Sequence, residues 1–276
     1  MYSRTIDHFV MAAETKCALL RDNPRGFLAG SMAGGAYVGL GIVLIFSIGA
    51  NLPGPLQRLG MGLTFAIALI LVVIAGAELF TGYAMYLALA RLAGRVSVRQ
   101  ALGVLVACWV GNFLGSALVA SLFAIGGANG LLNEAGSLVM KAAHAKMAAS
   151  PSELMARAVL CNWLVCLALW MSARVDSDVA KCVVIFWCLL AFIASGFEHC
   201  VANMTLLTLA IIGQHGDAAL VAGAAYNLAV VTAGNVIGGG VLVAGTYWLV
   251  TGRPSGAAEA PRSDLRSFGN SDARGH

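Results

Sequence analysis

Long charge-free runs alternate with short polar segments along the chain. A helix needs about 20 residues to cross a hydrocarbon core about 30 Å thick. Three runs, near residues 27–49, 101–133 and 218–252, reach this length once their ends are trimmed. A fourth run, 158–173, is shorter, but the arginines at both of its ends can extend their charged groups to the interface. Each of these four runs is therefore predicted to be a membrane-spanning helix.

Two further apolar runs are too long for one straight helix. Residues 59–90 and 182–214 are interrupted only by Glu78 and by Glu198 with His199. A continuous helix of about 32 residues would be about 48 Å long, whereas half of it is too short to cross. Non-helical backbone at membrane depth is tolerated where it packs inside protein or lines a cavity. Each run is therefore predicted to be one broken helix whose interruption faces a pore.

The two halves of the chain, about 26–133 and 153–252, repeat. Glu78 recurs as Glu198 after 120 residues, with a glycine two positions before each. Asn112 recurs as Asn235 after 123 residues, and glycines flank both asparagines. A half with three spans has its ends on opposite sides, so the second half must be inverted relative to the first. The fold predicted is an all-α membrane protein of six transmembrane helices in two inverted three-helix repeats.

The two ends of the chain differ from this six-span channel domain at 26–252. In the first 25 residues, apolar side chains recur at helical spacing, which predicts a cytoplasmic amphipathic helix that acts as a gate or only as an anchor. These side chains are Ile6, Phe9, Val10, Ala13, Cys17 and Leu20. The tail at 253–276 is rich in Gly, Ala, Ser and Arg, which predicts a disordered cytoplasmic segment.

Composition and charge agree with this arrangement. The mean hydropathy is +0.84 and only 11% of residues are charged, whereas about a quarter are charged in soluble domains. If both termini are cytoplasmic, the positive-inside rule leaves few of the 17 lysines and arginines outside. The outside ones are Arg58, Lys141, Lys146 and Arg157. The excess of lysine and arginine therefore indicates how the chain is oriented in the membrane, and nucleic-acid binding is not expected.

Candidate metal or cofactor chemistry is sparse. The seven cysteines form no CxxC pair and mostly lie in apolar stretches, so they are expected to be small buried hydrophobic residues. The five histidines are scattered and form no ligand spacing. An intramembrane enzyme with His199 and Glu198 as an acid–base pair is conceivable, but no nucleophile or metal set accompanies them. We expect no cofactor and no catalytic activity.

Three ionisable residues lie at membrane depth, where charge is expensive and commonly functional. Glu78 and Glu198 recur in both repeats, so we expect them to hold the broken backbone. His199 has Leu79 at the equivalent position, and this asymmetry favours a special role over a merely packed core histidine. His144 and Lys146 are expected in a polar loop outside the membrane, where His144 would be solvated.

This chemistry suits a weak-acid anion. A bare anion loses much solvation energy in an apolar constriction, and proton sharing removes much of that cost. Burial disfavours an unpaired cation, so an empty site keeps His199 neutral until an anion arrives to stabilise the imidazolium. Lys146, which we place outside, would concentrate anions at the mouth. Passage as the anion, as the neutral acid or with a coupled proton would all be compatible with this arrangement.

The sequence resembles the formate/nitrite transporter family over nearly all of residues 23–250. The matching stretches are AELFT at 77–81, LCNWLVCLA at 160–168, IASGFEH at 193–199 with ANM at 202–204, and GNVIGG at 234–239. The resemblance implies an aquaporin-like fold, assembled as a homopentamer with one pore per protomer in the bacterial inner membrane.

The resemblance also implies roles for individual residues. His199 matches the central pore histidine, Thr81 the threonine that faces it, and Lys146 the lysine of the periplasmic vestibule. The polar residues that hold the broken helices are matched by Asn162, Glu198 and Asn235. The two apolar constrictions are matched by Phe65 and Phe192, with Leu69 and Phe80.

The substrate within the family is a separate question. Gly82 follows Thr81 where formate channels usually carry serine, and 36–41 and 202–206 are similar to the nitrite branch. Nitrite is therefore the expected substrate, with formate or hydrosulfide as the alternatives. Cys200 stands where serine is expected, and the similar size of the two side chains predicts little functional change.

Overall fold

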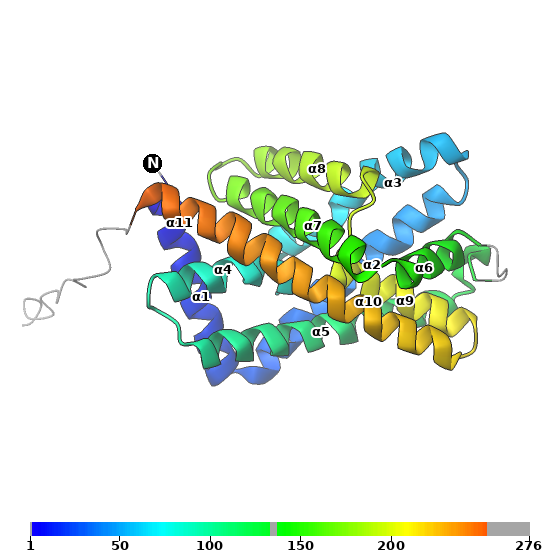
Figure 1. Cartoon of the computed structure of the whole chain (residues 1–276), viewed down its shortest axis with the longest axis horizontal. Helices are drawn as coiled ribbons and strands as arrows, with labels where there is room; N and C mark the ends of the chain where they lie inside the picture. Colours follow the sequence, from blue (N-terminus) through cyan, green and yellow to red (C-terminus); the bar gives the residue numbers. More distant parts are fainter. Residues whose placement is uncertain (1, 133–136, 253–276) are drawn as a thin grey trace, which may run out of the picture.

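The computed structural model describes residues 2–132 and 137–252, and the predicted tail at 253–276 lies outside them. These described residues form helices joined by short turns, and the long helices run along the long axis of the molecule (Figure 1). The α-helices are α1 (Ser3–Asp22), α2 (Pro24–Gly49), α3 (Gly54–Ile70), α4 (Phe80–Leu92), α5 (Val98–Ile125), α6 (Leu138–Ala148), α7 (Pro151–Ser172), α8 (Asp178–Ala194), α9 (Cys200–Gly213), α10 (Ala218–Ile237) and α11 (Thr246–Thr251). The shorter η1 (Leu71–Gly76) and η3 (Gly238–Gly245) are π-helical, and η2 (Ala128–Gly130) is a 3-10 turn.

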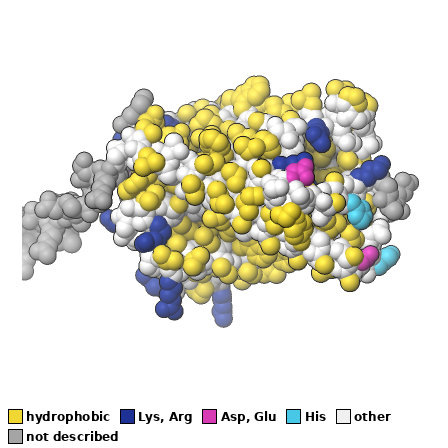
Figure 2. Space-filling model, in the orientation of Figure 1, with side chains coloured by type: hydrophobic (Ala, Val, Ile, Leu, Met, Phe, Trp, Pro, Cys, Tyr) yellow, Lys and Arg dark blue, Asp and Glu magenta, His cyan; other side chains and the backbone are white. Residues whose placement is uncertain are grey.

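Five helices within the described residues are long and apolar enough to cross a membrane. They span Pro24–Gly49, Gly54–Gly76, Val98–Ile125, Pro151–Ser172 and Ala218–Thr251, and the shorter α9 is also apolar. Hydrophobic side chains cover much of the face in Figure 2, while lysines and arginines lie mainly toward its two ends. An apolar surface of this extent is unfavourable in water and favourable in lipid. The chain is therefore a multi-pass membrane protein.

Two of the long apolar runs are broken. After η1, Gly76 has φ +82° and the extended residues Ala77 and Leu79 lead into α4. After α8, Gly196 has φ +70° and the extended His199 leads into α9. Glycine reaches a positive φ without a Cβ clash, so it can end each preceding helix. Both interruptions lie where the sequence places Glu78 and Glu198.

The apolar face of α1 packs against the other helices. Ile6, Phe9, Val10 and Ala13 are buried, and the ring of Phe9 lies 4.7 Å from that of Tyr86 in α4. Figure 1 places α1 at the same end of the molecule as α11, while α6 lies at the opposite end.

The segment before α7 differs from the sequence prediction. His144 and Lys146 were expected in a polar loop, but they lie on the helix α6. The Ser137 side chain caps α6 by accepting a hydrogen bond from the backbone N–H of Met140, and alanines fill much of the helix. Helix α6 positions these two side chains more firmly than a loop would.

Candidate pore site

His199 lies at the second break and is only 4% exposed. Its Nδ1 accepts a hydrogen bond from the backbone N–H of Ala202 at 3.1 Å, which caps α9. Its Nε2 lies 3.1 Å from Thr81 Oγ1 in α4. A backbone N–H can only donate, so Nδ1 carries no proton and the Nε2–H donates to the threonine. The geometry thus assigns His199 as the neutral Nε2–H tautomer.

This tautomer has two consequences for the site. An imidazolium would set an Nδ1–H against the Ala202 N–H, so protonation requires this capping bond to open. Thr81 Oγ1 accepts from His199, which leaves its own hydroxyl hydrogen free to point to another acceptor. Thr81 and His199 together can therefore present a hydrogen-bond donor to an anion.

Asn162 in α7 positions Thr81. Its Nδ2 donates to the carbonyl of Thr81 at 3.0 Å and to the carbonyl of Asn235 at 2.6 Å. The thiol of Cys166, one helical turn later, also reaches the Thr81 carbonyl, at 3.5 Å. All of these side chains are buried, so α4, α7 and α10 are fastened together beside the histidine.

Asn235 in α10 holds the backbone on both sides of His199. Its Nδ2 donates to the carbonyl of Glu198 at 3.0 Å and to that of Ala158 at 2.8 Å, while its Oδ1 accepts from the N–H of Cys200 at 2.9 Å. The amide thus supplies partners for backbone groups that the break leaves outside regular helix.

Asn112 in α5 makes the same set of bonds at the first break. Its Nδ2 donates to the carbonyls of Glu78 and Ser31 at 2.8 and 2.7 Å, and its Oδ1 accepts from the N–H of Phe80 at 2.9 Å. The sequence analysis used Asn112 only as a marker of the repeat and missed this role. Its correspondence to Asn235 was the signal that could have revealed it.

Both glutamates are ion-paired with lysines from outside the broken helices. Lys146 Nζ lies 2.8 Å from Glu198 Oε1, and Lys16 Nζ of α1 lies 2.8 Å from Glu78 Oε1. The Glu198 side chain is 3% exposed and that of Glu78 is 11% exposed. Asn203 Nδ2 also donates to Glu198 Oε2 at 2.6 Å. The roles of Lys16 and Asn203 were not predicted from the sequence, and neither was the ion pair of Lys146 with Glu198.

A very small apolar cavity adjoins His199. Its volume is about 10 Å³, and it is lined by Val38, Phe65, Ala68, Leu69, Leu79, Val165, Leu189, Phe192 and His199. The Phe65 and Phe192 rings meet edge to face at 5.4 Å, and Phe192 stacks on the His199 ring at 6.0 Å. A cavity of this size holds about one water molecule.

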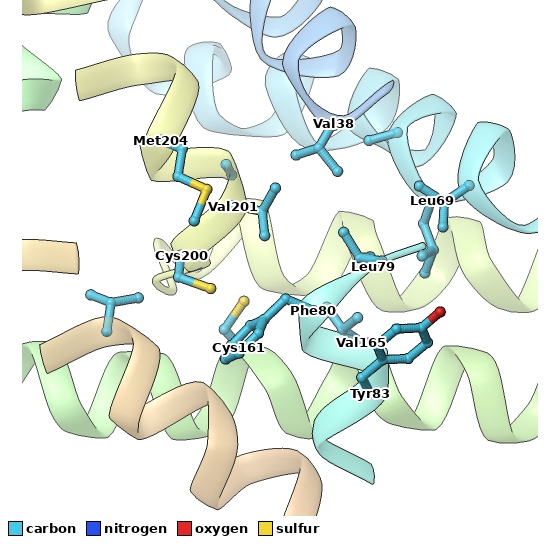
Figure 3. Close-up of a cluster of buried hydrophobic side chains, with 14 of the residues drawn as sticks. Val38, Leu69, Leu79, Phe80, Tyr83, Cys161, Val165, Cys200, Val201 and Met204 are labelled. Carbon is cyan, nitrogen blue, oxygen red and sulfur yellow. The ribbon is translucent and has the colours of Figure 1, made fainter. Parts of the chain in front are cut away.

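Phe80 is not among the residues that line this cavity. Figure 3 shows it beside Cys161 and Cys200, whereas Leu79 and Leu69 lie together on the other side of the cluster. The structure therefore brings together Phe65, Phe192 and Leu69 of the predicted constriction residues.

A much larger cavity, of about 850 Å³, lies on the other side of Leu79. Its walls include Lys16 and His8 of α1, Glu78, and the α4 residues Tyr83 and Tyr86. Leu79 lines both cavities, so the two cavities adjoin at this residue.

The comparisons with known proteins agree over almost the whole chain. The family model for formate/nitrite transporters matches residues 3–249. The nitrite transporter NirC of Salmonella typhimurium is 47% identical over 261 residues, which cover 95% of this chain and 96% of the relative. NirC of Escherichia coli is 46% identical, with 91% and 93% covered. The formate channel FocA of Haemophilus influenzae is 31% identical, with 82% and 87% covered.

Solved structures show a similar arrangement of helices. An FNT family ion channel superposes with a TM-score of 0.87 at 47% sequence identity, covering 90% of this chain and 99% of the other. A pentameric formate channel with formate bound gives a TM-score of 0.68 at 28% identity, with 82% and 97% covered.

Proposed function

Because this chain belongs to the formate/nitrite transporter family, we propose that it is a channel for nitrite and similar small monovalent weak-acid anions. Its family is one of transporters and channels rather than enzymes. The observation that carries the proposal is the narrow cavity, in which His199 is the one ionisable side chain among the lining residues. Relatives named as nitrite transporters at 46–47% identity support nitrite over formate.

The cavity selects among anions by the hydration energy that each loses on entering it. A bare anion that enters this apolar space loses water that its walls cannot replace, so a chloride ion is stopped. Nitrite differs because it can accept a hydrogen bond from the Thr81 hydroxyl and can share a proton. When the anion arrives, its charge stabilises the imidazolium that forms as the His199 bond to Ala202 opens. The imidazolium forms by taking up a proton that enters with the anion, and it passes a proton on to nitrite. His199 is then neutral again, and the neutral acid crosses the apolar rings.

The test is nitrite uptake by purified protein in liposomes that contain a pH-sensitive dye. His199→Phe should abolish proton-linked uptake and leave the oligomer intact on size exclusion. His144→Phe is the matched control, because this histidine is exposed on α6 and lies outside the cavity. Proton-linked uptake that persists in His199→Phe would overturn the mechanism. Wild-type protein that carries no nitrite would overturn the substrate.

The proposed architecture is six spans in two inverted repeats, assembled as a homopentamer in the bacterial inner membrane with both termini cytoplasmic. The matching bonds of Asn112 and Asn235 support the repeat. The pentameric solved neighbour supports the assembly. Native mass spectrometry tests the subunit number, and labelling of terminal tags in intact cells tests the orientation.

Within this architecture, 1–25 is the cytoplasmic N-terminal helix, 26–252 the channel domain and 253–276 the tail. The ion pair between Lys16 and Glu78 supports a role for α1 at the inner mouth, because it fastens this helix to the first break. Lys146, placed at the outer mouth, would attract anions while it balances Glu198.

A further inference from the structure

Two residues that line the large cavity each carry a buried polar atom without a hydrogen-bond partner among the described residues. These atoms are Glu78 Oε2 and the hydroxyl oxygen of Tyr83. Taken as whole residues, Glu78 is 8% exposed and Tyr83 is 3% exposed, and both line the cavity of about 850 Å³. Buried polar atoms in proteins are nearly always paired. Two unpaired atoms on residues that line one cavity therefore point to a ligand.

The second half of the chain shows which bond the first half lacks. Asn203 follows Glu198 by five residues, as Tyr83 follows Glu78. In both halves a lysine holds Oε1 of the glutamate at 2.8 Å. In the second half, Asn203 Nδ2 also donates to Oε2 of Glu198, at 2.6 Å. The first half carries a phenol at that position, and Glu78 Oε2 receives no such bond.

The two unpaired groups differ in chemistry. The Glu78 carboxylate oxygen accepts a hydrogen bond, whereas the Tyr83 hydroxyl can donate one. A free anion can accept from the tyrosine but has no hydrogen to donate to the Glu78 oxygen. A small neutral oxyacid has one O–H donor and one acceptor oxygen, which are the two partners that these groups lack.

We propose that Glu78 and Tyr83 form a binding site for the neutral acid form of the transported anion, where it emerges past Leu79 into the large cavity. This inference rests on the proposed function. At this site the acid gives up its proton: its O–H bond breaks, a bond from the proton to Glu78 Oε2 forms, and the electron pair stays on the acid oxygen. Lys16, released from a now neutral Glu78, then balances the charge of the anion. Once the anion has left, Glu78 releases the proton to water and pairs with Lys16 again. Passage in the opposite direction reverses each step.

The test uses Tyr83→Phe, which removes one hydroxyl and keeps the ring. Nitrite flux is measured from each face, in right-side-out and in inverted membrane vesicles. A lost hydrogen bond of ordinary strength raises the half-saturating concentration about fivefold. We expect this rise only from the face that bears the large cavity. The matched control is Tyr86→Phe, which removes a hydroxyl from the same cavity and should stay within about twofold of wild type.

A second variant covers the case in which Tyr83→Phe folds poorly. Tyr83→Asn places the second-half amide beside Glu78, so it should raise the half-saturating concentration at the same face while keeping the thermal stability. Nitrate then separates the acid from the anion, since it has nearly the same shape but no neutral form near neutral pH. Nitrate in tenfold excess at the cavity face should not compete.

Unchanged half-saturation in both Tyr83 variants would overturn the site, and competition by nitrate that Tyr83→Phe relieves would overturn its assignment to the acid. Either result with normal wild-type flux leaves the nitrite channel itself intact. Absence of wild-type flux would instead refute the proposed function.

Discussion

The asparagines at the two breaks allow one perturbation to be compared with its own control. Asn235→Ala and Asn112→Ala each remove a side-chain amide that makes three hydrogen bonds to the backbone. The two variants should therefore lose similar stability. They should differ in transport, because Asn235 holds the residues on either side of His199, whereas Asn112 holds those on either side of Leu79.

The magnitude follows from the number of bonds. A hydrogen bond contributes about 1 kcal/mol in soluble proteins and about 0.6 kcal/mol in membrane proteins, so three contribute about 2 to 3 kcal/mol. Each kcal/mol lowers the melting temperature of a chain of this size by about 2 to 4 °C. Both variants should melt about 4 to 12 °C below wild type in detergent.

The transport assay uses liposomes held well below both melting temperatures. Asn235→Ala should lose proton-linked nitrite uptake by about tenfold, since about 1.4 kcal/mol of misplacement at His199 is enough for that factor. Asn112→Ala should keep this uptake but leak chloride, because its loosened residue is the apolar Leu79 between the two cavities. Equal loss of uptake in the two variants would refute this expectation. So would a melting temperature of Asn235→Ala equal to that of wild type.

Three further predictions follow from the site and from α1. Phe65→Ala should open the ring pair at the narrow cavity and admit chloride, measured as an anion current in planar bilayers; unchanged chloride exclusion would show that the ring is no barrier. Lys146→Ala leaves the Glu198 charge unbalanced and should raise the half-saturating nitrite concentration severalfold without lowering the maximal flux. An equal loss of flux at low and at saturating nitrite would argue against electrostatic attraction. Burial raises the pKa of the Cys17 thiol, so at pH 8 this thiol should react with N-ethylmaleimide more slowly than free cysteine. An equal rate would mean that α1 does not stay packed against the other helices.

The helix breaks could be predicted because their signals are local. In each case an apolar run of about 32 residues, a glycine and a glutamate two positions later coincide within one stretch of sequence. The apolar face of α1 was equally readable from its spacing, and its central residues are buried. Boundaries and breaks of this kind depend on neighbours in the chain.

The partners across the fold could not be predicted in the same way. Lys16 lies 62 residues from Glu78, and the amphipathic pattern of α1 does not say which carboxylate its lysine meets. The bond from Asn203 to Glu198 is short in sequence, but it depends on how α9 turns after the break. The ion pair of Lys146 likewise requires α6, which was expected to be a loop.

The bonds of Asn112 set an order for the biogenesis of this protein. Asn112 follows Glu78 by 34 residues, so no amide can hold the first break until α5 has been synthesised. Until then, α4 is a 13-residue helix preceded by backbone that finds no water within the hydrocarbon. The insertion machinery must therefore shelter α3 and α4 until α5 arrives, and again α8 and α9 until α10 brings Asn235. A chain that ends just before residue 112 should therefore keep its first break unfastened, whereas one that extends through α5 should not.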